Sequence, residues 1–236
     1  MENKKILFGL TTITDGEWKN KVKEIDELGL KEIALFPTCL EYKERQELYK
    51  LLEKTKLVCI PHVHLREEDM DTAELDYLVE RFKTQVFNIH AGSGVINFLE
   101  HNKKYQDRIY VENTLMEDDF EKVLELCAGV CLDLSHWEDF GFLKKSEGYK
   151  TFSELLKKNK IGINHISGIK GEKVHCYDKF NDLDFYNYSD HRLNELSELD
   201  YVKKYKDYLA DIISIELENP FKRQLEIKKY LEKIIL

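Results

Sequence analysis

Six short apolar segments of the sequence each end in residues that can move protons or bind metal ions. His62 and His64 share a face of their segment, and we expect one of the two to be structural. Imidazole and carboxylate groups are the usual acids and bases of enzymes, and both ligate divalent ions. One carboxylate at such a position is commonly a helix cap, so the repetition is what indicates a site. The residues at the six segment ends are His62 and His64, His90, Glu112, Asp133 and His136, His165, and Glu216.

Alternation along a strand predicts which of these side chains face the same way. Asn88 and His90 share one face of their strand, as do Ser214 and Glu216. If the segment ends meet, the carboxylates and imidazoles would repel and desolvate one another unless a cation lay among them. A divalent metal resolves this conflict. Mixed oxygen and nitrogen ligands suit Mn²⁺, Zn²⁺, Co²⁺ or Mg²⁺.

Strand-like and helix-like segments alternate eight times along the chain. Gly29 ends the first predicted helix and Asp71 caps the third, as these residue types commonly do. A long polar and aromatic loop is predicted after the seventh strand. The predicted strands are residues 6–10, 33–36, 57–61, 86–90, 109–112, 130–134, 161–166 and 212–217. The predicted helices are residues 17–28, 41–54, 71–82, 96–101, 118–127, 151–159 and 197–209, with a last helix opened by Pro220.

Eight strand–helix units in 236 residues predict an α/β fold, a (β/α)8 TIM barrel that forms a single domain over residues 1–236. A doubly wound open sheet is the main alternative, but the chain has no G-x-G-x-x-G turn. No composition shift, linker or internal repeat marks a domain boundary. In a barrel the carboxyl ends of all strands meet on the face that carries active sites. The fold would therefore bring the six segment ends together.

The composition excludes several classes of protein. A formal net charge of −9 lacks the basic field of nucleic-acid binders, so we expect a small-molecule substrate and no nucleic acid. No apolar run approaches the roughly 20 residues of a membrane helix, and we read no signal peptide. The five cysteines include no C-x-x-C pair, so we expect a reduced, cytoplasmic protein in which Cys131 acts as a small hydrophobe. The oligomeric state is not predicted.

At these residues the sequence resembles the xylose isomerase-like TIM barrel superfamily, which holds sugar phosphate isomerases and epimerases together with endonuclease IV. The resemblance covers most of the chain, and its motifs occur in the family's order. It implies that Glu112, Asp133, His165 and Glu216 bind one divalent metal, as in the epimerase branch. The matching motifs are residues 88–92 (NIHAG), 111–113 (VEN), 132–136 (LDLSH), 164–167 (NHIS) and 214–220 (SIELENP).

The endonuclease IV branch binds three zinc ions, and the resemblance to it implies further ligands. His62, His90 and His136 match three of them. The nearest candidate for that branch's Asp-x-His pair is His175, which follows a Lys where the branch has Asp. Residues 190–191 could substitute only with a shifted loop. The number of ions, and with it the branch, stays open at this point.

The residues and the resemblance together predict a metal-dependent isomerase or epimerase of a small sugar or sugar phosphate. The metal would stabilise an enediolate, while Glu112 and Glu216, expected on nearly opposite sides of the mouth, would exchange protons with the substrate. His90 and His136 would hold substrate hydroxyls. Trp137 would either cover an apolar face of the sugar or pack in the core. Residues 177–190 would form either a lid or a loop packed on the rim.

Two other functions are consistent with the same residues. One is a phosphoester hydrolase of the endonuclease IV type, with two or three zinc ions and Glu112 bridging. The other is a barrel that binds a metal or metabolite without catalysis. The number of bound ions separates them, because one ion indicates an isomerase and several indicate a hydrolase. His101 and His191 lie in polar segments and are expected at the solvated surface.

Overall fold

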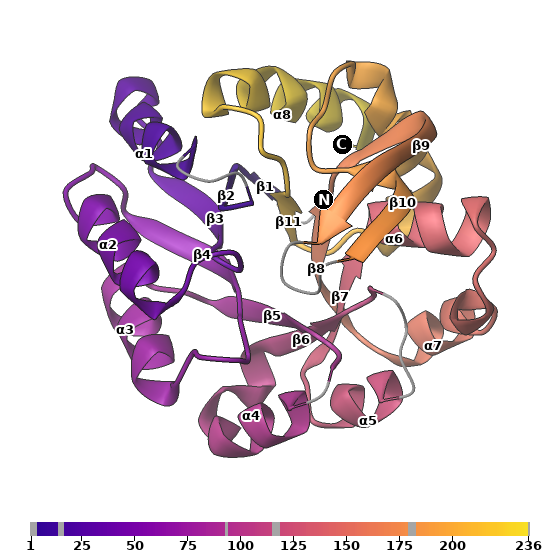
Figure 1. The fold of residues 1–236 in the computed structure, drawn as a ribbon, viewed down its shortest axis with the longest axis horizontal. Helices are drawn as coiled ribbons and strands as arrows, with labels where there is room; N and C mark the ends of the chain where they lie inside the picture. Colours follow the sequence, from indigo (N-terminus) through magenta and orange to yellow (C-terminus); the bar gives the residue numbers. More distant parts are fainter. Residues whose placement is uncertain (1–3, 14–16, 93, 115–118, 179–182, 236) are drawn as a thin grey trace.

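Parallel strands wind into a barrel with helices around its outside, which confirms the predicted (β/α)8 TIM barrel (Figure 1). The computed structural model describes residues 4–13, 17–92, 94–114, 119–178 and 183–235. Neighbouring strands of the barrel are all parallel. In their order around the barrel the strands are β1 (Lys5–Leu7), β11 (Ile212–Ile215), β8 (Ile161–Ile166), β7 (Gly129–Asp133), β6 (Ile109–Glu112), β5 (Val86–His90), β4 (Cys59–His64), β3 (Glu32–Phe36) and β2 (Gly9–Thr11).

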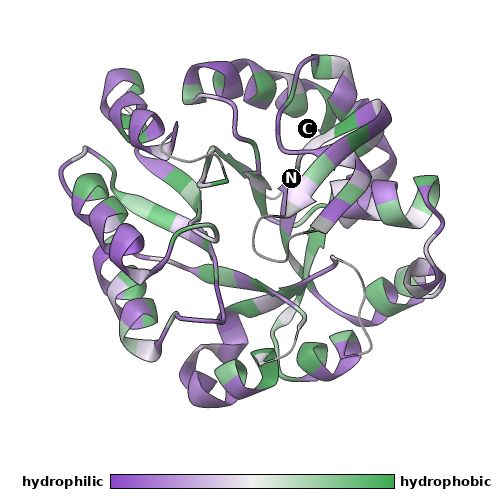
Figure 2. Ribbon diagram, viewed as in Figure 1, coloured by the Kyte–Doolittle hydropathy of each residue, from purple (hydrophilic) through white to green (hydrophobic). Residues whose placement is uncertain are grey.

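Helical segments follow the strands, and they carry hydrophobic and hydrophilic residues side by side (Figure 2). The predicted helix 197–209 is instead a 3₁₀ segment with a non-helical residue at Tyr205. In the described part of the chain, no helix combines the length and apolarity needed to cross a membrane. The α-helices are α1 (Glu17–Leu28), α2 (Tyr42–Leu52), α3 (Thr72–Phe82), α4 (Val95–His101), α5 (Phe120–Glu125), α6 (Leu134–His136), α7 (Phe152–Lys158) and α8 (Phe221–Ile235). The other helical segments are η1 (Lys103–Arg108), η2 (Trp137–Leu143, a π-helix), η3 (Glu147–Tyr149) and η4 (Leu196–Tyr208).

Residues at the helix ends explain why two helices begin and end where the sequence predicts. α1 ends before Gly29, whose φ of 64° is a left-handed conformation that glycine adopts without strain. α3 begins after Asp71, whose side chain accepts a hydrogen bond from the backbone N–H of Glu74. These ends direct each helix back along the outside of the barrel to the start of the next strand.

The first predicted strand is divided in two because the chain changes partners at Phe8. β1 pairs with β11 and β2 pairs with β3, so this segment closes the barrel. A Cβ atom on Gly9 would lie 1.8 Å from the carbonyl oxygen of Ile215, so the close approach requires glycine. The side chain of Gln224 accepts a hydrogen bond from Gly9 N and donates one to Gly9 O, which adds two hydrogen bonds where the barrel closes.

Side chains inside the barrel change from apolar to polar along the strands. On β6, β7 and β8 an inward apolar residue is followed two residues later by a candidate metal ligand. Phe87 and Ile89 lie in the outer core against the helices, as the predicted alternation on β5 requires. On these three strands the apolar residues therefore form a floor beneath the polar mouth. The pairs are Tyr110 and Glu112, Cys131 and Asp133, and Ile163 and His165.

The third predicted strand, residues 57–61, is shifted toward its carboxyl end in the structure. β4 begins at Cys59 and continues through Pro61 to His64. Pro61 has no N–H to donate, but its carbonyl oxygen accepts a hydrogen bond from Gln85 N, so pairing with the next strand continues. The shift places both histidines of this segment inside the strand.

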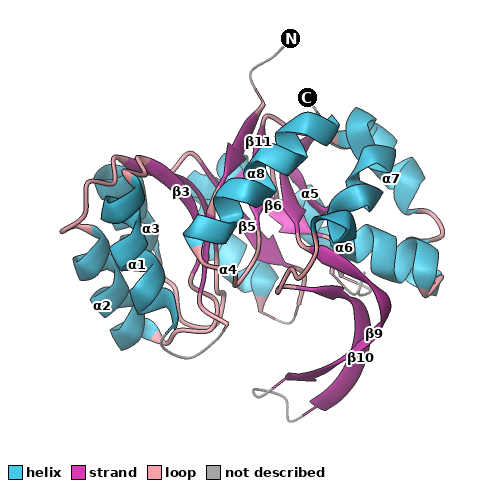
Figure 3. Cartoon of the chain, turned by 90° about the horizontal axis from the view of Figure 1, so that it is seen from above, coloured by secondary structure: helices cyan, strands magenta, loops and turns pink. Residues whose placement is uncertain are grey.

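The predicted loop after the seventh strand is wrong, because most of it forms a β-hairpin. β9 (Gly168–Asp178) and β10 (Leu183–Asp190) pair antiparallel and extend from the barrel on the side opposite the chain termini (Figure 3). Aromatic residues concentrated in β10 favour a strand over a loop. Asp139 of η2 anchors the hairpin, since its Oδ2 accepts hydrogen bonds from Tyr188 N and Ser189 N. Phe180, which belongs to the segment expected to form either a lid or a loop packed on the rim, lies outside the described residues.

Replacing Gly9 by alanine should destabilise the protein by about 3 kcal/mol or more, because the new methyl group would overlap a backbone oxygen that cannot move aside. The measurement is the free energy of unfolding from denaturant titration. Gly171→Ala is the matched control, since a Cβ atom there would meet nothing within 4 Å. Equal stability of the two variants would contradict the role of Gly9 in closing the barrel.

Candidate metal centre

The four residues expected to bind one metal converge at the carboxyl ends of β6, β7, β8 and β11. Glu112, Asp133, His165 and Glu216 each offer a ligand atom within 4.8 Å of the other three. His165 Nδ1 is 3.2 Å from Glu112 Oε2 and 3.1 Å from Glu216 Oε2. The barrel thus brings together residues that are separated by up to about a hundred positions in the sequence.

The donor atoms of this cluster fit a divalent cation. Asp133 Oδ2, both ring nitrogens of His165 and Glu216 Oε2 are buried and make no hydrogen bond among the described residues, and the close contact of His165 Nδ1 with Glu216 Oε2 is an ion-pair contact only. A buried polar atom without a partner costs about 1–3 kcal/mol, so native proteins rarely leave several together. Three carboxylates and one imidazole are a ligand set that Mg²⁺, Mn²⁺, Co²⁺ or Zn²⁺ accepts. These four residues are therefore the ones that would hold a metal.

Hydrogen bonds fix which oxygen of Asp133 faces the cluster. Its Oδ1 accepts from Ser135 Oγ at 2.6 Å and from the backbone N–H of His136 at 2.8 Å. The second bond caps the short helix α6. Because Oδ1 is occupied in this way, Oδ2 is the oxygen left for a ligand.

The buried carboxylates need positive charge beside them. Burial alone raises the pKa of Glu112, but His165 and His90 lower it well below its usual range. Burial likewise raises the pKa of Glu216, yet His165 lowers it to about 2. The pKa of His165 is lowered by burial but raised well above its usual range by Cys131, Glu112 and Glu216. A proton on His165 supplies positive charge beside the carboxylates, and a divalent ion would supply it in place of that proton.

His64, and not His62, belongs to the mouth. His64 Nε2 lies 3.2 Å from Glu112 Oε2 and 3.0 Å from His90 Nε2, so these three residues form a second possible metal-binding group. His90 keeps 47% of its side chain exposed. Both ring nitrogens of His62 are instead hydrogen-bonded inside the barrel. The expectation that one of the pair is structural holds, but selecting His62 for the mouth was wrong, because β4 continues to His64.

His136 lines the mouth beside the cluster. Its Nδ1 is 3.6 Å from Glu112 Oε1 and 3.9 Å from Asp133 Oδ2, and 15% of its side chain is exposed. The same nitrogen is 3.2 Å from the carbonyl oxygen of Asn113, which orients the ring. His136 and His90 are thus both open to solvent and next to the candidate ligands.

Two residues near the cluster were missed by sequence reasoning. His191, expected at the surface, lies with Nδ1 3.1 Å from the carbonyl oxygen of Glu216, because the β9–β10 hairpin returns the chain to the mouth. Cys131 forms a third possible ligand group with Glu112 and His165, although burial raises the pKa of its thiol to about 12. Cys131 could have been identified because it lies two residues before Asp133 on the same strand, and alternate residues of a strand share a face.

Two residues predicted to bind substrate or a second metal do not join the others. The ring of Trp137 is buried and packs edge-on against Phe152 and Tyr208, so it belongs to the aromatic core. His175 is exposed on β9, where its Nε2 is 2.6 Å from Asp184 Oδ1. The structure therefore gives neither residue a place beside the metal cluster.

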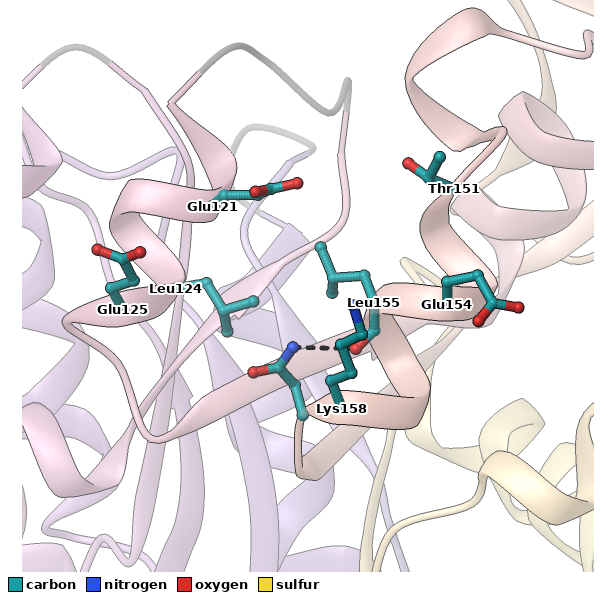
Figure 4. Close-up of a pocket in the computed structure, with 8 residues that line it drawn as sticks. Glu121, Leu124, Glu125, Thr151, Glu154, Leu155 and Lys158 are labelled. Atoms are coloured by element: carbon teal, nitrogen blue, oxygen red, sulfur yellow. Dashed lines mark hydrogen bonds between the residues drawn. The ribbon is translucent and has the colours of Figure 1, made fainter.

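A groove of about 440 Å³ lies between α5 and α7 on the outside of the barrel (Figure 4). Glutamates from both helices surround two leucines, and Asn159 Nδ2 donates to Leu155 O at the carboxyl end of α7. None of the predicted site residues lines it. The predicted residues that converge therefore do so at the mouth of the barrel and not in this groove.

Comparisons with known proteins support the fold. No protein-family model matches the chain, and a search of curated proteins finds no match. A solved structure of a xylose isomerase-like TIM barrel protein from Mycobacterium smegmatis in complex with magnesium is 12% identical, with a TM-score of 0.50 over 99% of this chain and 98% of that one. Phospho-2-dehydro-3-deoxyheptonate aldolase from Thermotoga maritima is 11% identical, with a TM-score of 0.52 over 98% of this chain and 68% of that one. At these identities the likeness establishes the TIM barrel fold alone.

Adding Mn²⁺ at about 100 times its dissociation constant should raise the unfolding temperature by roughly 5 to 10 °C, because an ion that binds only the folded state stabilises it. Asp133→Asn should lose most of this shift, since the amide keeps the helix cap but removes the negative charge. Differential scanning calorimetry with and without EDTA measures the shift in unfolding temperature. Asp107→Asn, at an exposed carboxylate, is the control. Equal shifts in the two variants would argue against the centre.

Proposed function

We propose that the protein is a divalent-metal-dependent isomerase or epimerase that acts on a small sugar or sugar-phosphate-like hydroxy-carbonyl compound. The observation that carries the proposal is the cluster at the mouth, where buried atoms of Asp133, His165 and Glu216 make no hydrogen bond among the described residues. A xylose isomerase-like TIM barrel protein from M. smegmatis with the same fold was solved in complex with magnesium, and TIM barrels carry their active sites at this face, so both facts support the proposal.

Glu112, Asp133, His165 and Glu216 would hold the ion. When bound there, a divalent metal polarises adjacent carbonyl and hydroxyl oxygens of a substrate and stabilises the negative charge that follows proton loss. The ligand set is rich in oxygen, which suits Mg²⁺ and Mn²⁺, and its one imidazole also allows Co²⁺ or Zn²⁺.

Proton transfer would be carried by Glu216 and Glu112. Glu216 keeps 12% of its side chain exposed, against 1% for Glu112, so Glu216 is the carboxylate that a substrate in the mouth reaches more easily. One oxygen of each lies within 4.8 Å of the other, which corrects the expectation of opposite sides and fits two ligands of one ion. The second oxygen of each carboxylate would remain to accept or return a proton.

Three histidines would position the substrate around these carboxylates. His90 and His136 border Glu112 and are exposed to solvent, so their ring nitrogens would hydrogen-bond substrate hydroxyls. His191 lies beside Glu216, with Nδ1 3.1 Å from its carbonyl oxygen. Its pKa is lowered by burial but raised by the Glu216 carboxylate, which favours an imidazolium that donates to a substrate oxygen.

A second candidate function is a zinc-dependent phosphoester hydrolase of the endonuclease IV type. The observation that favours it is the group formed by His64, His90 and Glu112, which shares Glu112 with the first cluster and would hold another ion. Two ions bridged by one carboxylate are typical of hydrolytic metal sites. His175, one of the further ligands that this function would need, lies away on the hairpin.

An isomerase should exchange a substrate carbon-bound hydrogen with solvent. Incubating a panel of ketoses and ketose phosphates with the protein and Mn²⁺ in D₂O should incorporate deuterium, detected by NMR. Glu216→Gln should slow this exchange by about 10²- to 10⁴-fold, because the amide cannot accept the proton. Glu100→Gln, at an exposed carboxylate on α4, should exchange at the parent rate.

No exchange across the panel, together with Mn²⁺- or Zn²⁺-dependent cleavage of bis-p-nitrophenyl phosphate or abasic DNA, would replace the isomerase by the hydrolase. Absence of both activities in protein that binds metal would leave a binding function.

A further inference from the structure

A chain of hydrogen bonds runs through the barrel interior beneath the candidate metal centre. Ser214 Oγ is 2.8 Å from His62 Nδ1, and His62 Nε2 is 2.7 Å from Asn88 Oδ1. Asn88 Nδ2 donates to Glu112 Oε2 at 2.6 Å. Ser214, His62 and Asn88 are fully buried, and Glu112 is 1% exposed. The chain therefore links three residues outside the cluster to one of its carboxylates.

The direction of every bond in this chain follows from its end at Glu112. A carboxylate only accepts, so the Asn88 amide nitrogen must face Glu112 and the amide oxygen must face His62. An amide oxygen also only accepts, so His62 Nε2 carries the proton. In the neutral ring Nδ1 then has none, and the Ser214 hydroxyl donates to it. One tautomer of His62 and one orientation of Asn88 satisfy all three bonds.

Glu112 Oε2 is a crowded atom that needs to be held. Besides Asn88, it has His64 Nε2 and His165 Nδ1 at 3.2 Å, and both are candidate ligands themselves. Rotation of the carboxylate would move both oxygens relative to a metal. The hydrogen bond from Asn88 Nδ2 opposes that rotation as long as the amide keeps its orientation. His62 holds this orientation, because its Nε2–H donates to Asn88 Oδ1.

We infer that His62 is a positioning residue for the metal centre, which acts through Asn88 to fix the orientation of the Glu112 carboxylate. The inference rests on the proposed metal function. Packing alone does not require a histidine here, because the neighbouring interior layer is filled by apolar side chains such as Leu7, Ala34 and Phe36. A buried polar residue with two hydrogen-bonded nitrogens is better explained by orientation of the group at the end of the chain.

Substitutions separate this role from packing. His62→Leu fills the space but removes both polar nitrogens, so Mn²⁺ should bind roughly 10- to 100-fold more weakly. His62→Gln can donate to Asn88 and accept from Ser214, so it should bind nearly as tightly as the parent. Asn102→Leu is the matched control, since Asn102 is buried at the carboxyl end of α4 and its side chain hydrogen-bonds Phe98 and Thr72 and not Glu112. Mn²⁺ affinity is measured by the EPR signal of the free ion.

Parent affinity in folded His62→Leu protein would overturn the inference, as would an equal loss in Asn102→Leu. If His62→Leu does not fold, ¹⁵N NMR of histidine-labelled parent protein decides the question. The His62 ring should carry its proton on Nε2, and a proton on Nδ1 would contradict the chain of donors. This spectrum needs no metal, so its result is independent of the proposed function. Parent protein that binds no Mn²⁺ would instead refute the proposed function itself.

Discussion

Negative charge held away from water at the mouth of the barrel is the constraint on which the site depends. Glu112 and Asp133 are buried, and Glu216 is nearly so, yet no Lys or Arg side chain forms an ion pair with any of them in the described part of the chain. Buried carboxylates without a counter-charge would be too costly to keep ionised. His165 contacts two of them and takes part of this charge. A divalent ion would neutralise more of it, and at the same time activate a substrate.

The rest of the barrel makes this arrangement stable. Closure at Gly9 fixes the strand spacing, and the apolar layer that includes Tyr110 and Ile163 gives the polar mouth a dry floor. Ser135 holds one oxygen of Asp133, and Asn88 holds one oxygen of Glu112. These two carboxylates are thus oriented by neighbours that carry no charge, so neither hydrogen bond balances their negative charge.

Regular features of the sequence were sufficient to predict the barrel and the meeting of its six strand ends, while the choice of four candidate metal ligands among them came from the family resemblance. Strand alternation with period two identified the inward faces, and six strand ends with acidic or basic residues identified the mouth. His62 and His64 could not be separated in this way, because they share a face and differ only in depth along β4. The positions of Trp137 and His191 depend on how the segments between the barrel strands fold, which residue types alone do not determine. The β9–β10 hairpin was missed because charged residues interrupt its alternation.

The most direct test of the account is a crystal structure of the protein grown with Mn²⁺, with anomalous diffraction recorded on both sides of the manganese absorption edge. If these four residues bind the ion, an anomalous peak lies about 2.0–2.3 Å from Asp133 Oδ2, Glu216 Oε2, a ring nitrogen of His165 and an oxygen of Glu112. A second peak between His64 and His90 would favour the hydrolase. No peak at the mouth, with these side chains paired to one another or to water, would contradict the binding of a divalent metal ion by these four residues.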